Sequence, residues 1–252
     1  MAHDIDFKII GDDMQAVEIE LDPSESVRAE VGAMLCMEDD IQMDTSSGGG
    51  IFQGLKRIVS GENFFITSFL NTGTIKRTVT FAAPYPGKII SLNLNEIGGS
   101  FLCQRDGFLC AAQGIDINVE FTKRMGAGLF GGEGFILQRL SGDGKAFVHA
   151  GGTTIRKELK ANERLKVDTG CLVAFQPTVE YDIQFIGGFK NVLFGGEGLF
   201  YAQLTGPGIV YLQTLPFSRL ADRIISASGW IARKDESRGI GGLLGGIISG
   251  RE

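Results

Sequence analysis

Residues 129–135 read Leu-Phe-Gly-Gly-Glu-Gly-Phe, and residues 193–199 read Leu-Phe-Gly-Gly-Glu-Gly-Leu. A shorter relative of this phrase, Ser-Gly-Glu-Asn-Phe, occupies residues 60–64. The glutamates of the three phrases are 71 and 64 residues apart along the chain. A phrase that returns at a nearly constant interval predicts one structural unit that is present three times.

A second landmark keeps the same spacing. A charged residue, one further residue, a glycine and then an apolar stretch begin at Glu30, Arg105 and Asp168, and the glycine of each lies 25 to 29 residues before the glycine that precedes the glutamate. Two landmarks at matched distances strengthen the prediction of a threefold internal repeat.

Each glutamate is followed by an apolar run, a glycine turn and a second apolar run. These stretches span residues 64–81, 135–148 and 199–212. Short apolar runs rich in Val, Ile and Phe on either side of a glycine turn are typical of paired strands. We therefore predict a β-hairpin after each glutamate.

Apolar and polar residues alternate with a period of two in residues 17–21, 90–95, 116–121 and 181–185. This alternation is typical of antiparallel sheets in which one face is buried and the other faces water. The 37 glycines among 252 residues fit many tight turns between short strands, because only 6 prolines accompany them and they show no collagen-like period.

The predicted fold is therefore all-β, with three tandem repeats at residues 1–86, 87–151 and 152–216. The boundaries follow the turn residues Pro84 to Gly87 and Gly151-Gly152. We expect the three repeats to share one hydrophobic interior and to be arranged with pseudo-threefold symmetry.

The pattern changes in residues 217–252. Apolar residues recur at helical spacing after Pro216, which predicts a short helix. A glycine-rich tail follows, and its apolar residues fall on one helical stripe: Ile240, Leu243, Leu244, Ile247 and Ile248. Six glycines, at about 1 kcal/mol each, would melt such a helix alone in water. We expect these five residues to dock on a partner surface, or the tail to be disordered.

The formal net charge of −6 and the pI of about 5.1 make nucleic acid an unfavourable partner. No apolar stretch is long enough for a membrane span, and the N-terminus lacks the pattern of a signal peptide. We expect a cytoplasmic protein, with peripheral contact to a membrane through the tail left open.

Residues that carry chemistry are scarce. The two histidines are His3 and His149, and we interpret His149 as an exposed or hydrogen-bonded structural residue opposite Thr78 and Gln213 of the other repeats. A glycine pattern at residues 126–131 matches a dinucleotide-binding fingerprint, but a strand rather than a helix is expected after it. We predict no catalytic residue, no cofactor and no metal.

The four cysteines are Cys36, Cys103, Cys110 and Cys171. They form no Cys-x-x-Cys pair and lie in apolar, strand-like surroundings, where a cysteine most often acts as a small buried hydrophobe. A redox pair or a metal site is the alternative.

The polar set that recurs in every repeat is Glu62, Glu133 and Glu197. Around a threefold pseudo-axis these carboxylates would form a ring able to hold a cation or to bind nearby Lys and Arg side chains. The simpler interpretation, which we prefer, is a glutamate that accepts backbone N–H bonds at a tight turn or forms an ordinary ion pair.

These motifs together resemble one known family. The run Gly-Gly-Gly-Ile-Phe-Gln-Gly-Leu-Lys-Arg at residues 48–57, the two Phe-Gly-Gly-Glu-Gly phrases and the glycine-leucine tail are similar to those of the Altered Inheritance of Mitochondria protein twenty-four family. The resemblance implies three units similar to the tryptophan RNA-binding attenuation protein, each a small β-sandwich of the double-stranded β-helix kind. It implies little about function, and likeness of fold does not carry RNA binding across.

We favour a non-enzymatic, self-associating β scaffold that presents protein-binding faces. Its partners would be further copies of the same chain and, through the tail, a membrane-associated protein. The alternatives are a β module that binds a small ligand or nucleotide and, less favoured, an RNA-binding protein by analogy of fold.

Overall fold

The computed structural model describes residues 1–30, 32–44, 66–123, 135–185 and 200–227. Strands make up about 59% of the described residues, which form four sheets and one short helix, so the all-β prediction is confirmed. Three groups of predicted features lie outside the described residues: Glu62, Glu133 and Glu197; the tail residues Ile240, Leu243, Leu244, Ile247 and Ile248; and the glycine pattern at residues 126–131.

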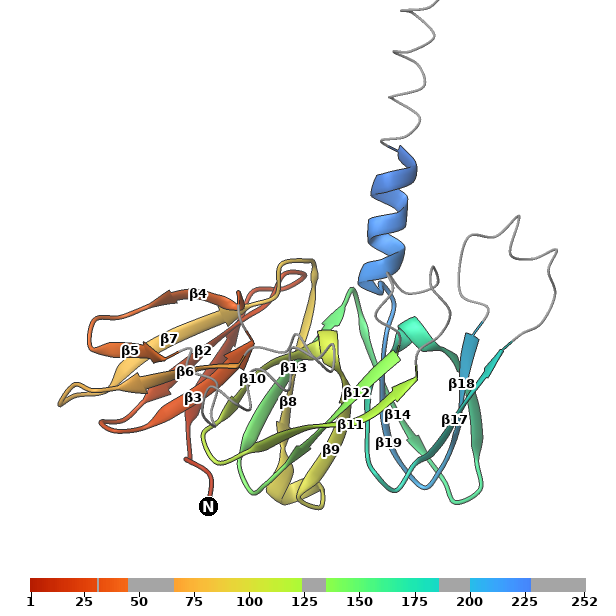
Figure 1. The fold of residues 1–252 in the computed structure, drawn as a ribbon, viewed down its shortest axis with the longest axis horizontal. Helices are drawn as coiled ribbons and strands as arrows, with labels where there is room; N and C mark the ends of the chain where they lie inside the picture. Colours follow the sequence, from red (N-terminus) through yellow and green to blue (C-terminus); the bar gives the residue numbers. More distant parts are fainter. Residues whose placement is uncertain (31, 45–65, 124–134, 186–199, 228–252) are drawn as a thin grey trace, which may run out of the picture. The chain divides into compact units, whose positions relative to one another are not determined.

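The strands fall into three successive segments of the chain (Figure 1). The first segment comprises β1 (Asp6–Ile10), β2 (Ala16–Leu21), β3 (Ser26–Glu30), β4 (Met34–Met37), β5 (Ile41–Asp44), β6 (Ile66–Asn71) and β7 (Arg77–Ala82). The second comprises β8 (Gly87–Asn93), η1 (Leu94–Ile97), β9 (Ser100–Gln104), η2 (Arg105–Gly107), β10 (Phe108–Ala112), β11 (Asp116–Lys123), β12 (Phe135–Ser141) and β13 (Lys145–Gly151). The third comprises β14 (Thr154–Leu159), β15 (Arg164–Asp168), η3 (Thr169–Cys171), β16 (Leu172–Phe175), β17 (Glu180–Phe185), β18 (Phe200–Thr205) and β19 (Gly208–Gln213).

The described strands form four sheets, two of which connect neighbouring segments. Their strand orders are β1-β2-β7-β4, β5-β6-β3-β10-β13-β8, β11-β12-β9-β16-β19-β14 and β15-β18-β17. Each six-stranded sheet therefore combines three strands of one segment with three strands of the next. Strand β4 is one of the two outer strands of the first sheet, and β15 is one of the two outer strands of the last sheet.

The same pairing order recurs in all three segments. The orders β2-β7-β4, β8-β13-β10 and β14-β19-β16 correspond, as do β3-β6-β5, β9-β12-β11 and β15-β18-β17. A register shift also recurs at the same place, between Met34 and Cys36, between Phe108 and Cys110, and between Leu172 and Ala174. A bulge of this kind bends a strand and fixes its register, so it marks corresponding positions.

The predicted hairpins are wrong, although their strands exist. The two strands after each glutamate lie in different sheets: β12 pairs with β11 and β9, whereas β13 pairs with β10 and β8. The connection between β12 and β13 contains Gly142 at φ 149°, a conformation that favours glycine. A glycine turn therefore carries the chain from one sheet to another here, and local composition does not distinguish that corner from a hairpin.

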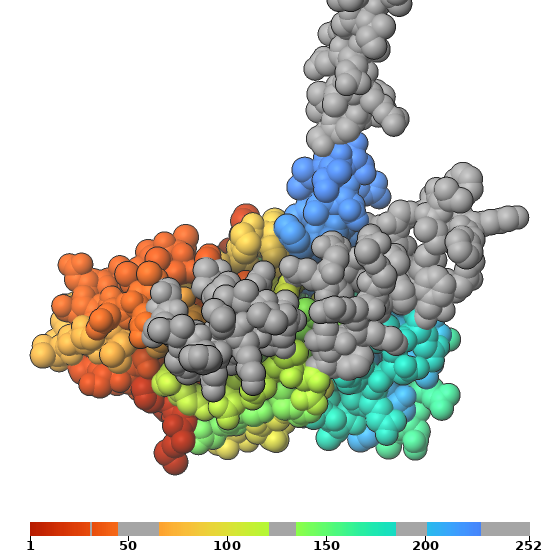
Figure 2. All heavy atoms as spheres, viewed as in Figure 1, coloured from red at the N-terminus to blue at the C-terminus, as the bar shows by residue number. Residues whose placement is uncertain are grey.

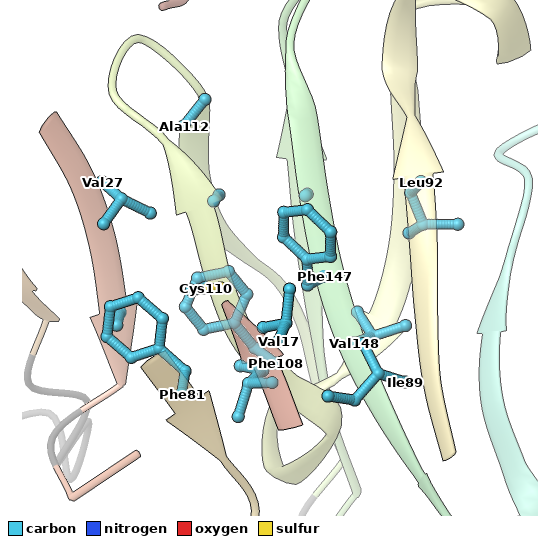
Figure 3. Packing of buried hydrophobic residues seen from close by; sticks show 14 of the residues in the cluster. Val17, Val27, Phe81, Ile89, Leu92, Phe108, Cys110, Ala112, Phe147 and Val148 are labelled. Carbon is cyan, nitrogen blue, oxygen red and sulfur yellow. The ribbon is translucent and has the colours of Figure 1, made fainter. Parts of the chain in front are cut away.

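The buried faces of the sheets form two apolar clusters. The first joins β2 and β7 to the six-stranded sheet that contains β3, β10 and β13, and Figure 3 shows Phe81, Val27, Cys110 and Phe147 in it. The second lies between the other six-stranded sheet and β15, β17 and β18. Burial of large side chains in these clusters is the main favourable contribution to folding.

The predicted alternation is confirmed in β2 and only partly in β11. Val17, Ile19 and Leu21 are fully buried, and the glutamates between them are half-buried. In β11, however, Val119 is 37% exposed. The reason is position, because β11 is the outer strand of its sheet and has a neighbour on one side alone among the described strands.

The chain divides into two compact units, Met1–Pro216 and Phe217–Glu252. Within the second unit, residues 217–227 form the predicted helix. Its apolar residues Phe217, Ile224 and Ile225 are more than half exposed. Among the described residues, no helix combines the length and the apolar character that a membrane crossing requires.

Candidate functional site: two strand edges

Strands β3 and β10 form the junction between the first and second segments. They pair antiparallel with the register Cys110↔Ala29, Ala111↔Arg28 and Ala112↔Val27. The pairing continues one position further, because the Gln113 N–H donates to the Ser26 carbonyl at 3.1 Å. The Arg28 guanidinium also donates to the Ile115 carbonyl at 3.2 Å, so side chains reinforce the backbone pairing.

Strands β9 and β16 form the second junction in the same way. Their register is Ala174↔Cys103 and Phe175↔Leu102. Two side-chain amides cross this junction: Gln104 donates to the Thr169 carbonyl at 2.6 Å, and Gln176 donates to the Ile97 carbonyl at 3.2 Å. The recurrent bulges make Cys110 correspond to Ala174, so both junctions use one register.

The strand β4 corresponds to β10 and β16 but lies at the end of a sheet. When the three strands are aligned at their bulges, Leu35 corresponds to Leu109 and Val173. Leu109 and Val173 are 2% and 1% exposed, whereas Leu35 is 63% exposed. Met37 is 40% exposed, and the orange part of the chain around β4 forms surface in Figure 2. An apolar strand edge of this kind is a typical site of pairing with another chain.

An acidic turn follows β4. The Glu38 carboxylate accepts a hydrogen bond from the Thr78 N–H at 2.7 Å, and the Asp40 carboxylate pairs with the Arg77 guanidinium at 2.6 Å. Asp39, between them, is exposed. These contacts hold the carboxylates of Glu38 and Asp40 in place, and the exposed Asp39 lies between them, so three carboxylates lie beside the exposed edge.

The strand β15 is the other terminal edge, and it is basic. It corresponds to β3 and β9, but among the described strands it pairs with β18 alone. Arg164 and Lys166 are exposed, and the Lys166 Nζ lies 5.0 Å from the centroid of the Tyr201 ring. A cation over an aromatic face is held in place by the ring quadrupole.

The cysteine prediction is confirmed for two residues. Cys103 and Cys110 are buried, and burial raises the pKa of the Cys103 thiol to about 12 and the pKa of Cys110 well above its ordinary value. For Cys36 the prediction is wrong, because this residue is exposed on β4, where no further strand covers it among those described. Cys171 is intermediate.

The interpretation of His149 needs two corrections. The residue is buried, not exposed, and its Nδ1 has no hydrogen-bond partner within the described part of the chain. The register aligns it with Ala82 and Gln213 rather than with Thr78, because the turn between β6 and β7 is longer than its counterparts. Burial lowers the pKa of His149 to about 4, so the ring is neutral at pH 7 and packs edge-on against Tyr85.

The remaining candidate chemistry is structural as well. The His3 Nδ1 accepts a hydrogen bond from the Ser26 N–H at 3.0 Å, which ties the N-terminal stretch to β3. Desolvation raises the pKa of Glu30, and Asp106 raises it further. No group of three or more His, Cys, Asp or Glu residues in the described ranges is arranged to hold a metal ion.

A solved structure has a similar fold, and a relative and a family model match the sequence. A crystal structure of a protein from Streptococcus pyogenes matches with a TM-score of 0.73 at 24% identity, over 88% of this chain and 99% of that one. An uncharacterised protein of Streptococcus pyogenes serotype M6 is 29% identical over 213 residues, which are 81% of this chain and 83% of that protein. Residues 7–215 match the family described as mitochondrial biogenesis AIM24. The predicted resemblance is confirmed, and the chain belongs to the AIM24 family.

Proposed function

We propose that this protein is a non-enzymatic, self-associating β scaffold that presents its surfaces to other proteins. The observation that carries the proposal is the exposed edge at Leu35, Cys36 and Met37. The corresponding positions in β10 and β16 are buried under a neighbouring strand. A strand that has the composition of an internal strand but stands at an edge favours association.

The three segments are, in this proposal, copies of one β-sandwich module of the double-stranded β-helix kind. The recurrent pairing order, the recurrent bulges and the shared junction register support this view. An open succession of modules fits the sheet order better than the predicted closed pseudo-threefold arrangement, because β4 and β15 end different sheets. The proposed location is the cytoplasm, with the tail as the contact to a membrane-associated partner.

Light scattering over a range of protein concentrations tests the association. We expect the mass of the full chain to rise above 27.1 kDa as the concentration increases. A chain that ends at Ser237 lacks the apolar stripe of the tail and serves as the comparison. Association that survives this truncation assigns the contact to the β segments, whereas its loss assigns it to the tail. A mass of one chain for both proteins at every concentration would contradict the proposal.

A further inference from the structure

We infer that the β4 edge of one copy pairs with the β15 edge of a second copy, in the register that both internal junctions use. This inference rests on the proposed self-association and names its partner and its contact. Within the chain, β3 pairs with β10 and β9 pairs with β16. Strand β15 corresponds to β3 and β9, and strand β4 corresponds to β10 and β16. Among the described strands of these two sets, β15 and β4 are the ones that lie at the end of a sheet.

The internal register specifies the contact residue by residue. Cys36 corresponds to Cys110 and Ala174, and Val167 corresponds to Ala29 and Cys103. Transfer of the register places Cys36 opposite Val167, Met37 opposite Lys166 and Glu38 opposite Leu165 of the second copy. One position further, Asp39 lies opposite Arg164, as Gln113 lies opposite Ser26 within the chain.

The charges of the two edges are complementary. The turn after β4 carries Glu38, Asp39 and Asp40, and β15 exposes Arg164 and Lys166. Opposite charges across strands stabilise a pairing, and like charges destabilise it. Pairing of β4 with β4 would bring the acidic turns of two copies together, whereas pairing of β4 with β15 brings Asp39 opposite Arg164. The contact between unlike edges is therefore the favoured one.

A basic residue on an edge strand often discourages pairing. Here the first junction shows that the position tolerates it, because Arg28 corresponds to Lys166 and lies opposite Ala111 in a formed pairing. The bulge of β4 is no obstacle either, since β10 and β16 carry the same bulge and pair on both sides.

The partner is a second copy rather than the same chain. Strand β4 lies in the first sheet and β15 lies in the last, and the two six-stranded sheets come between them when the four sheets are ordered by their first strand in the chain. Figure 1 shows β4 on one side of the six-stranded sheets, and β17 and β18, which share a sheet with β15, on the other. A contact between two different surfaces of identical chains is heterologous, so it produces closed rings or open chains of subunits.

Two edge variants of the full chain test the inference. Leu35→Lys places a charge on β4 at a position that is exposed in one chain but would be buried at the junction. The double variant Arg164→Glu and Lys166→Glu makes β15 acidic and repels the turn after β4. Ile75→Lys is the matched control, because Ile75 is 57% exposed in the same segment and lies outside both edges. Circular dichroism and thermal unfolding verify that each variant folds.

Sedimentation velocity then separates the outcomes. We expect the wild type and the control to associate, each edge variant alone to bind itself at least tenfold more weakly, and an equal mixture of the two edge variants to stop at a dimer. The mixture forms that dimer because each variant retains the edge that the other lacks. If the wild type associates and both edge variants associate equally well, edge pairing is wrong while self-association stands. If the wild type remains a single chain, both proposals fail.

A disulfide test checks the register. In a Cys36→Ser background, Met37→Cys and Lys166→Cys introduce two thiols at exposed positions that the register places opposite each other. Antiparallel opposite residues have Cα atoms about 4.5 to 5.5 Å apart, within the range of a disulfide. We expect oxidation to link separate chains. The control moves the second cysteine to Arg164, two positions out of register, and should link poorly. Equal linking in both pairs, or a disulfide within one chain, would overturn the inference.

Discussion

The strands β4 and β10 contain the same dipeptide, Leu-Cys, at corresponding positions, yet one copy faces water and the other is buried. Leu109 is 2% exposed and Leu35 is 63% exposed. Both strands pair with the corresponding strand of their own segment, and they differ in the neighbour on the other side. Whether the Leu-Cys dipeptide is buried therefore depends on whether a second strand pairs with the strand that carries it, and not on the residues of that strand.

The largest expected difference between these two positions is in thiol reactivity. We expect an alkylating or disulfide reagent to modify Cys36 at least about a thousandfold faster than Cys110 in the folded chain, equivalent to about 4 kcal/mol of opening free energy. Burial raises the pKa of the Cys110 thiol, which slows its reaction further. Peptide-resolved mass spectrometry at low protein concentration measures both rates.

Denaturant provides the control for this experiment, because all four cysteines should react at similar rates once the chain is unfolded. A Cys110 rate within tenfold of the Cys36 rate in the native protein would show that the junction between β3 and β10 opens readily. That result would contradict the difference in burial between β4 and β10 on which the proposed edge pairing rests.

The same pair of positions predicts a difference in stability. Leu109→Ala should lower the free energy of unfolding by about 3 kcal/mol, because it removes buried methyl groups and leaves a cavity. Leu35→Ala should lower it by less than about 0.5 kcal/mol in the single chain, since the side chain is exposed there. Urea unfolding at low protein concentration measures both changes. Equal losses would mean that Leu35 is buried in solution.

Local signals in the sequence were sufficient for the strands themselves. The alternation of Val17, Ile19 and Leu21 with glutamates predicted β2 correctly, since a period of two depends on the strand alone. The sequence predicts the glycine turn between β12 and β13, but it does not indicate the strands with which β12 and β13 pair. Pairing depends on residues far away in the chain, and a tight turn is compatible both with a hairpin and with a change of sheet.

The candidate site was harder to predict for the same reason. Cys36 and Cys110 have similar neighbours in the sequence, and nothing local indicates that β4 stands at the end of a sheet. One signal was available: among the three described segments, the first and the last each have a neighbouring segment on one side only, and the outer faces of the end units in a row of similar units are atypical. Applied to β4 and β15, this argument would have identified both edges.

The buried residue His149 titrates, so the pH dependence of stability tests whether the core is closed to water, in contrast to the exposed edges. Burial lowers the pKa of His149 from 6.5 to about 4. The unfolded chain therefore binds a proton at a higher pH than the folded chain, so this residue reduces the free energy of unfolding as the pH falls from about 6.5 to about 4. Between pH 7 and pH 5 the reduction should be about 2 kcal/mol.

The variant His149→Gln isolates this contribution, because Gln213 occupies the corresponding position and does not titrate. We expect the free energy of unfolding of the variant to change by about 2 kcal/mol less than that of the wild type between pH 7 and pH 5. Glu30 and the other carboxyl groups are common to both proteins and cancel in the difference. Parallel pH profiles would place His149 in contact with water.

The smallest effect on stability is expected for the ion pair between Glu120 of the outer strand β11 and Arg139 of β12, because this pair is partly exposed to solvent. The Arg139 guanidinium donates to both carboxylate oxygens of Glu120 at 2.7 and 2.9 Å, and both side chains are about one-third exposed. A double-mutant cycle with Glu120→Gln and Arg139→Gln should give a coupling of about 0.2 to 1 kcal/mol at pH 7. The hydrogen bond from Arg139 lowers the pKa of Glu120, so the coupling persists above the ordinary carboxyl range and is lost only as the pH falls through this lowered pKa. A coupling above about 2 kcal/mol would mean that this edge, like the β4 edge in our proposal, is covered in solution.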